Sequence, residues 1–159
     1  MPTIPKGITI AYLTLLGITL GAGLYAGIVV APVIFHSETY LGAPLLTRFQ
    51  EGLIMTENFV RLGYLVDFTV LAVALYEGFR YKNFDRDTIT SVAAFLVIAF
   101  GLLYVHYYMP QILEFQQQGE TVTKSELFEK AHLASEIDFK LFAASLLALL
   151  VRNLWRGLK

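Results

Sequence analysis

Apolar residues gather in four long stretches along the chain, at residues 8–35, 59–79, 89–108 and 135–155. Each stretch is close to or above the roughly 20 helical residues that cross the 30 Å hydrocarbon core of a bilayer. The first stretch carries no charged residue, and the third has one ionisable side chain besides its tyrosines, His106. The pattern therefore predicts an all-α integral membrane protein, a four-helix bundle in which residues 1–159 form a single transmembrane domain.

A shorter amphipathic pattern lies between the first two stretches. Its apolar residues recur at helical spacing with polar residues between them, and they are Leu45, Leu46, Phe49, Leu53 and Ile54. This spacing predicts a short amphipathic helix that lies at the membrane surface and connects the first two membrane helices.

The composition agrees with membrane insertion and narrows the possible chemistry. Apolar residues make up 56% of the chain and charged residues 16%, whereas about 25% of an average soluble domain is charged. The net charge of −1 offers no attraction to a polyanion, so we expect the lipid bilayer as partner and no nucleic acid. Because the chain has no cysteine, disulfides, thiolate metal sites and covalent CxxCH haem attachment are excluded.

Lysine and arginine are unevenly divided between the two ends of the predicted bundle. The end that holds both termini carries Lys6, Arg80, Lys82, Arg86, Arg152, Arg156 and Lys159, whereas the basic residues of the other end are mixed with glutamates. Because lysine and arginine mark cytoplasmic loops, we expect a bacterial inner-membrane protein with both termini in the cytoplasm. Asp85 and Asp87 precede the third stretch and are expected to cap its helix.

Small residues form two ridges on the first predicted helix. Gly17 and Gly21 form one ridge, and Gly23, Gly27 and Ala31 form the other. The two ridges lie on different faces, so two neighbouring helices can approach closely. We favour packing within the bundle, and the alternative is contact with a second copy of the chain or with a larger membrane complex.

Ionisable residues on the second and fourth predicted helices form a candidate polar pocket at the end away from the termini. Its members are Arg61, Tyr64 and Asp67 on the second helix, and Glu136, Asp138 and Lys140 on the fourth. A charge near the bilayer centre costs about 2.5–3.5 kcal/mol. We therefore expect Asp67 to face the bundle, with Lys140 or Arg61 as its counter-charge. The cluster can fix helix register through ion pairs, or it can form a ligand, ion or proton site.

The three histidines also fall at this end, on three different helices. His36 follows the first stretch, His106 ends the third and His132 opens the fourth, one helical turn before Glu136. Imidazole is a common ligand of zinc, copper and haem iron, and a nearby carboxylate can complete the shell. The candidate cofactor is therefore haem b or a divalent transition metal, held by the three histidines with Glu136 as a further metal ligand. Because no HxxxH or ExxH repeat occurs within a helix, hydrogen-bonded packing histidines are the alternative.

Three short motifs carry a family resemblance: "GLYAGIVVAPVIF", "YVHYYMPQI" and "FEKAHLAS". They resemble the four-helix membrane family called domain of unknown function 4149, which includes relatives of the human platinum-tolerance transmembrane protein. Pro110 matches the proline after the third span, and Phe128, His132 and Ser135 match an F-x-x-x-H-x-x-S pattern that opens the fourth. Leu133 stands where that family often has glycine. The resemblance implies the fold and a role for His132, but no settled activity.

A weaker likeness concerns the end of the first helix. "VVAPVIFHSE" is similar to the corresponding segment of the membrane haem-dependent protoporphyrinogen oxidase, which also carries a histidine there. The histidine expected earlier in that helix is absent, since "AYLTLLGITL" contains none.

These patterns favour a non-enzymatic membrane protein, a metal- or haem-binding or transport-related module with an outward-facing polar pocket. No nucleophile elbow, phosphate loop or dinucleotide fingerprint indicates an enzyme. Two alternatives remain open. One is an accessory or assembly subunit of a larger membrane complex, and the other is a haem-dependent membrane oxidoreductase.

Overall fold

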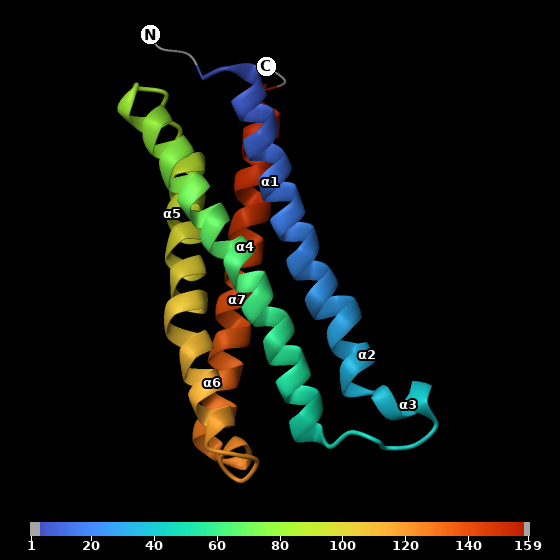
Figure 1. Cartoon of the computed structure of the whole chain (residues 1–159). Helices are drawn as coiled ribbons and strands as arrows, with labels where there is room; N and C mark the ends of the chain where they lie inside the picture. Colours follow the sequence, from blue (N-terminus) through green and yellow to red (C-terminus); the bar gives the residue numbers. More distant parts are fainter. Residues whose placement is uncertain (1–3, 158–159) are drawn as a thin grey trace.

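The computed structural model describes residues 4–157, and helices are the only regular elements in that part of the chain. Four long rods run the length of the molecule (Figure 1). The first rod consists of α1 (Lys6–Tyr25), η1 (Ala26–Val30) and α2 (Ala31–Phe35), and the second is α4 (Arg48–Lys82). The third consists of α5 (Thr88–Leu103), η2 (Tyr104–Tyr108) and α6 (Met109–Gln117), and the fourth is α7 (Glu126–Gly157). The short helices α3 (Ser37–Leu41) and η3 (Val122–Lys124) lie in the connections. The predicted all-α bundle is confirmed.

The rods form an antiparallel bundle with two distinct ends. Helix α1 packs against α4 and α7, and α5 packs against the same two helices. The start of α1, the end of α7 and the α4–α5 connection lie together, and we call this the terminal end (Figure 1). The opposite end holds α3 and the α6–α7 connection, and we call it the loop end.

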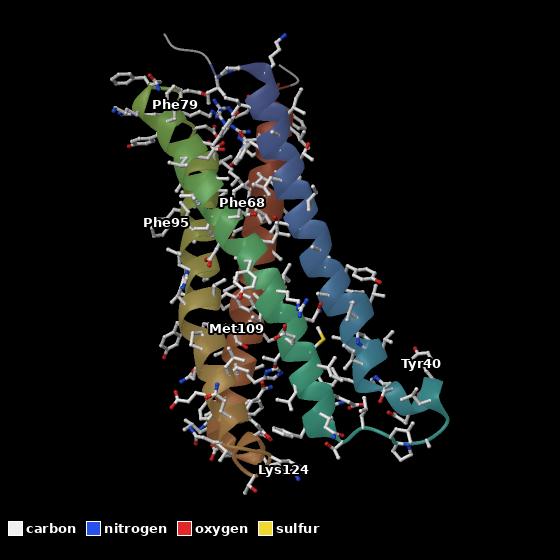
Figure 2. The ribbon with its side chains drawn as sticks, in the orientation of Figure 1. Tyr40, Phe68, Phe79, Phe95, Met109 and Lys124 are labelled. Atoms are coloured by element: carbon white, nitrogen blue, oxygen red, sulfur yellow. The ribbon has the colours of Figure 1, made fainter. Side chains whose placement is uncertain are left out.

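Three rods are long and apolar enough to cross a membrane: Lys6–Phe35, Arg48–Lys82 and Thr88–Gln117. Large apolar side chains on the outside of the bundle agree with a lipid environment. Phe68 and Phe95 are 60% and 67% exposed, and Phe95 projects away from the other rods (Figure 2). We therefore describe the chain as a membrane protein.

The fourth predicted span, residues 135–155, lies in α7. This helix has 32 residues, but among the residues described it is not one of the candidate spans. Its apolar sequence is interrupted by Glu136, Asp138, Lys140, Arg152 and Arg156. The crossing of α7 therefore stays a prediction, and its close packing beside α1 and α5 supports it.

The core lies where the four rods meet. Apolar side chains with no exposed surface come from every rod, namely Leu16, Val66, Val73, Val97, Leu146 and Leu149. Among the glycines, Gly101 is the most tightly packed, because an added Cβ there would lie 2.5 Å from Val70 Cγ2 and 3.2 Å from Phe142 Cε2. Glycine is needed at this position because any side chain would meet the neighbouring helices.

Within the amphipathic stretch after the first rod, Phe49, Leu53 and Ile54 are helical but belong to α4, whereas Leu45 and Leu46 lie before this helix. Thr47 caps the helix, because its hydroxyl accepts from the Gln50 backbone N–H while the Gln50 side chain accepts from the Thr47 N–H. From Arg48 the helix continues without a break to Lys82. The short separate helix of this connection is α3, five residues long, so the predicted surface helix and the second membrane helix are one element.

Two π-helical segments occur two residues before prolines. In η1 the N–H of Ala31 reaches back to the carbonyl of Ala26, and in η2 the N–H of Met109 reaches back to Tyr104. Pro32 and Pro110 follow each segment and cannot donate to an α-helical bond. The wider turn lets each helix continue past its proline. π-helical turns often occur at functional sites, and both of these segments lie in the half of the bundle nearer the loop end.

Candidate functional site

A groove opens on one side of the bundle near the loop end. Helix α1 packs against both α4 and α7, whereas the following α2 packs against α4. The first rod therefore diverges from α7 towards the loop end (Figure 1). The space between them holds a cavity of about 850 Å³, which we call the lateral groove. This volume lies within the range of small-molecule sites, about 300–1,000 Å³.

An aromatic cluster forms the deep wall of the lateral groove. Phe59 of α4, Tyr104 of η2 and Phe139 of α7 all line it. The Phe139 ring centroid lies 5.5 Å from that of Phe59 and 4.9 Å from that of Tyr104. Across the groove Gly23 nearly touches this wall, because an added Cβ would lie 3.0 Å from Phe139 Cζ. One turn further along, an added Cβ on Gly27 would meet no heavy atom within 4 Å, so the groove widens there.

A polar stripe on α7 borders the same groove. His132, Glu136 and Lys140 share one helical face, and all three line the groove. Lys140 Nζ donates to Glu136 Oε1 at 2.7 Å. The His132 ring stacks on Phe128 with an interplanar angle of 8°. The groove therefore combines an apolar interior with charged groups along one wall.

A buried carboxylate holds the loop end of the first rod to α4. Glu51 is 5% exposed, and its Oε1 accepts from Ser37 Oγ at 2.6 Å. Arg48 Nη1 donates to the Phe35 carbonyl at 3.0 Å, and its guanidinium lies over the Phe35 ring. Glu51 lies four residues before the apolar Met55, and this shared helical face is the sequence signal that Glu51 faces inward.

Asp67 and His106 form a pair outside the lateral groove. His106 Nε2 lies 3.0 Å from Asp67 Oδ1, and the two side chains are 60% and 36% exposed. The prediction that Lys140 or Arg61 balances Asp67 is wrong. Arg61 Nε donates to Glu57 Oε1 at 2.8 Å, and Lys140 is paired along α7. Residues four positions apart on a helix are neighbours. Arg61 and Lys140 therefore each pair with a glutamate of their own helix.

The structure does not bring the three histidines together. His132 lines the lateral groove, His106 lies outside it, and His36 Nδ1 bonds to the Pro32 carbonyl at 3.0 Å. Tyr64, another predicted pocket residue, is 73% exposed on α4 and does not line the groove. Within residues 4–157 no three His, Asp or Glu side chains are grouped to hold a metal ion. Metal or haem binding stays a prediction. Of the three histidines, His132 alone lines the groove and could hold such a group there.

Asp138 does not line the lateral groove, and it lies two residues from both Glu136 and Lys140, which puts it on the opposite face of α7. It is 5% exposed, and its Oδ2 has no hydrogen-bond partner among the described residues. Asp138 is the most deeply buried carboxyl group among the predicted pocket residues.

The most extensive buried polar cluster lies at the terminal end and was not predicted. Tyr12 Oη donates to Glu77 Oε1 at 3.0 Å, and Asn153 Nδ2 donates to the same oxygen at 2.8 Å. Arg80 Nη1 lies 3.3 Å from Glu77 Oε2 and also contacts the Asn153 side-chain oxygen. This terminal network joins α1, α4 and α7. Glu77 lies inside the predicted span 59–79, which was an available signal, but nothing in the sequence identified its partners.

Two aspartates of the α4–α5 connection extend the terminal network. Arg80 Nε donates to Asp85 Oδ2 at 2.8 Å, and Arg156 contacts Asp85 as well. Arg152 donates to both carboxylate oxygens of Asp87, at 2.6 and 3.0 Å. Asp87 caps α5 as predicted, whereas the Asp85 carboxylate is bonded to Arg80 and Arg156.

The charges around these two aspartates change their proton affinity. Hydrogen bonds from the Arg152 guanidinium, and then from Thr90, hold the pKa of Asp87 well below its ordinary value of 3.8. For Asp85, partial burial raises the pKa, but the bonds from Arg80 and Arg156 outweigh it and the pKa is lowered. Both groups are therefore ionised at neutral pH and act as fixed anions.

Comparison with known proteins identifies a family for most of the chain. The family described as "Domain of unknown function (DUF4149)" matches residues 14–121, from the middle of α1 to the connection after α6. No curated protein and no solved structure matches the chain. The motifs "GLYAGIVVAPVIF" and "YVHYYMPQI" lie within the matched residues, and the His132 motif lies beyond them. No finding supports the likeness to protoporphyrinogen oxidase.

Proposed function

Because the chain belongs to the DUF4149 family, whose description assigns no activity, we propose a function from its geometry. The protein is a non-enzymatic binding module of the membrane, and its lateral groove takes an amphipathic, lipid-like molecule that enters sideways from the bilayer. The observation that carries this proposal is the divergence of the first rod from α7, which leaves a groove of about 850 Å³ lined by all four rods.

The chemistry of the groove suits such a ligand. Its deep wall is the aromatic cluster, and the small side chain of Gly27 leaves open space on the opposite wall. The α7 wall offers His132, Glu136 and Lys140 to a polar head group. An apolar pocket with a few converging polar groups is the usual form of a small-molecule site. An apolar tail can reach this one without crossing water, because the groove opens on the side of the rods.

The location follows from the distribution of charge. The terminal end carries Lys6, Arg80, Lys82, Arg86, Arg152 and Arg156 among the described residues, and Lys159 lies outside them. The positive-inside rule supports a cytoplasmic terminal end in a bacterial inner membrane. The lateral groove then lies in the outer half of the bilayer, where the predicted outward-facing pocket was placed.

A subunit role is the second candidate, and one observation favours it. Added Cβ atoms on Gly17 and Gly21 would meet nothing within 4 Å, so this ridge of α1 is not used by the bundle. Small-residue ridges are common in contacts between membrane helices. A partner protein that co-purifies in mild detergent, and is lost when Gly21 becomes isoleucine, would support this role.

The binding proposal is tested with two matched tryptophan variants. Gly27→Trp places a large side chain in the groove, whereas Gly17→Trp places the same side chain on α1 in open space outside it. With protein purified in an alkyl maltoside, we expect Gly27→Trp to lower the affinity for pyrene-labelled phosphatidylcholine at least about tenfold. Gly17→Trp should bind like the wild type. Equal binding by all three proteins would overturn the proposal.

The same preparation tests the cofactor alternatives. Elemental analysis and an absorption spectrum report a stoichiometric metal or a haem Soret band. A Soret band that disappears in His132→Ala would replace lipid binding with haem binding at the groove, and a redox-active haem would favour the oxidoreductase.

A further inference from the structure

An aspartate and a histidine lie together on the outside of the bundle. Asp67 Oδ1 of α4 and His106 Nε2 of the third rod are 3.0 Å apart, and the two side chains are 36% and 60% exposed. Both rods are candidate membrane spans. Ionisable side chains inside a membrane almost always face the bundle interior or a water-filled cavity. This exposed pair does not line the lateral groove, so a second surface is needed to remove it from lipid.

The pair lies at the depth of the hydrocarbon layer. Asp67 precedes Lys82, the last residue of α4, by 15 residues, or about 22 Å of helix. Arg61, whose ion pair with Glu57 is exposed, lies six residues nearer the loop end, or about 9 Å. Lys82 and Arg61 are therefore separated by about the thickness of the hydrocarbon core, about 30 Å. Asp67 lies between these two basic residues and not at the boundary that either of them marks.

Apolar surface adjoins the pair on both rods. Leu71 of α4 and Leu102 of α5 lie one turn nearer the terminal end than Asp67 and His106, and they are 56% and 43% exposed. Tyr64, one turn of α4 nearer the loop end, is 73% exposed. We call Tyr64, Asp67, Leu71, Leu102 and His106 the α4–α5 face. None of these residues lines the lateral groove, so a protein that covers this face leaves the groove open.

The α4–α5 face is complementary to a second copy of itself. Two copies that cross the membrane in the same direction can be related by a twofold rotation about the membrane normal, which places residues of equal depth opposite one another. Two identical faces that oppose each other exchange left and right, so α4 of one copy meets the third rod of the other. Asp67 and His106 are bonded and therefore lie at the same depth. The rotation then places Asp67 of each copy opposite His106 of the other.

We propose that the chain forms a twofold dimer through the α4–α5 face, in which the Asp67–His106 pairs of the two copies face each other and are removed from lipid. The bond within one copy uses Oδ1 and Nε2, which leaves Asp67 Oδ2 and His106 Nδ1 for bonds to the other copy. Polar bonds between helices stabilise contacts inside the membrane. A second copy supplies a carboxylate and an imidazole at the required depth, whereas an unrelated partner would have to carry both groups independently.

The absence of cysteine from the chain permits a direct test by crosslinking. Two differently tagged copies, one with Leu71→Cys and one with Leu102→Cys, are co-expressed, and isolated membranes are oxidised with copper phenanthroline. We expect a disulfide-linked dimer that carries both tags and is lost on reduction. Ile18→Cys replaces Leu102→Cys in the control. Ile18 is 56% exposed on α1 and lies at similar depth, because it follows the start of α1 by 12 residues and Leu71 precedes the end of α4 by 11.

Two outcomes of the crosslinking would overturn the inference. Equal yields from the Leu71–Leu102 and Leu71–Ile18 combinations would show that the copies meet only by random collision. A dimer linked through Gly21→Cys alone, with none through Leu71 and Leu102, would place the contact on the small-residue ridge of α1 instead.

Complementary variants test the polar contact itself. Self-association is measured by energy transfer between dyes on C-terminal tags, in vesicles of phosphatidylethanolamine and phosphatidylglycerol, after circular dichroism has shown that each variant is helical. Asp67→Ala alone and His106→Ala alone should each associate about tenfold more weakly than the wild type. A mixture of the two variants keeps one carboxylate opposite one imidazole, so it should associate more tightly than either variant alone. A mixture that associates no better than the separate variants would show that no Asp67–His106 contact joins the copies.

Discussion

The two ends of this bundle use charged residues in opposite ways. At the terminal end, Glu77, Arg80 and Asn153 bond across helices, between residues more than 70 positions apart. At the loop end, most ion pairs join residues four positions apart in the sequence. Glu57–Arg61 and Glu136–Lys140 lie within one helix, and Glu120–Lys124 lies in the α6–α7 connection. Cross-helix bonds fix the distance between helices, and pairs within a helix do not.

This difference explains why the first rod stays close to α7 at the terminal end and diverges from it towards the loop end. Bonds from Glu77 to Tyr12 and Asn153 hold α1, α4 and α7 together at the terminal end. Near the loop end, Arg48–Phe35 connects the first rod to α4, and Ser37–Glu51 connects the adjoining α3 to α4. No such bond ties η1 or α2 to α7 among the described residues, so the first rod can diverge and leave the lateral groove. The position of cross-helix polar bonds, and not the number of charges, determines where the first rod can separate from α7.

Removing Arg80 should have the largest effect on stability. The Arg80 and Glu77 side chains are 13% and 8% exposed, and Arg80→Ala leaves the buried Glu77 carboxylate without its cation. We expect the free energy of unfolding to fall by about 3–5 kcal/mol, measured by circular dichroism in mixed detergent micelles. The control is Arg61→Ala, whose pair with Glu57 is exposed, with an expected loss of about 0–1 kcal/mol. Equal losses in the two variants would contradict the contrast between the ends.

Ser37→Ala tests the contact that holds the loop end of the first rod. The variant removes the hydroxyl that donates to buried Glu51 at 2.6 Å. Because the acceptor is a carboxylate, we expect unfolding to become easier by about 1.5–3 kcal/mol. The variant should also increase the mobility of α3, measured by hydrogen exchange of its amides. Unchanged exchange in α3 would show that Arg48 alone is sufficient for this contact.

Two glycine variants distinguish the packed core from the groove. Gly101→Ala places a Cβ 2.5 Å from Val70 Cγ2, and such overpacking costs about 1–3 kcal/mol. Gly27→Ala adds the same methyl group where no heavy atom lies within 4 Å. There the better helix propensity of alanine should leave stability unchanged or raise it by up to about 1 kcal/mol. The comparison uses thermal unfolding followed by the fluorescence of Trp155, the single tryptophan, and a loss at Gly27 as large as at Gly101 would argue against an open groove.

The smallest effect concerns the pH dependence of the terminal end. The pKa of Asp87 is lowered in the folded protein, so the unfolded chain takes up a proton more readily. The stability contributed by its charge is therefore present above its ordinary pKa of 3.8 and lost as the pH falls through the lower folded value. Asp87→Asn keeps a capping side chain and removes the charge. We expect it to be slightly less stable than the wild type at pH 7, and the difference should shrink steadily as the pH falls from 3.8 towards the lower folded pKa of Asp87. A difference that persists in acid would assign the effect to the cap.

Part of the candidate site could be predicted from the sequence. The spacing of His132, Glu136 and Lys140 placed them on one face of α7, and all three line the groove. The spacing of Arg61 and Asp67 was interpreted in the same way, yet Arg61 pairs with Glu57 and Asp67 pairs with His106. Periodicity determines which side chains share a helical face, but not which neighbouring helix that face meets.

What the sequence determined by itself was the set of long apolar helices and the cap at Asp87, because helix formation and lipid exposure depend on the spacing of residues along one chain. Glu77 and Asp138 stood in the same sequence as isolated carboxyl groups. Only the tertiary structure decided that the first was satisfied by Tyr12, Arg80 and Asn153 and that the second was buried, with no hydrogen-bond partner for its Oδ2 within residues 4–157. Such partners depend on the rotation and separation of whole helices, which are set by packing contacts distributed over the entire bundle.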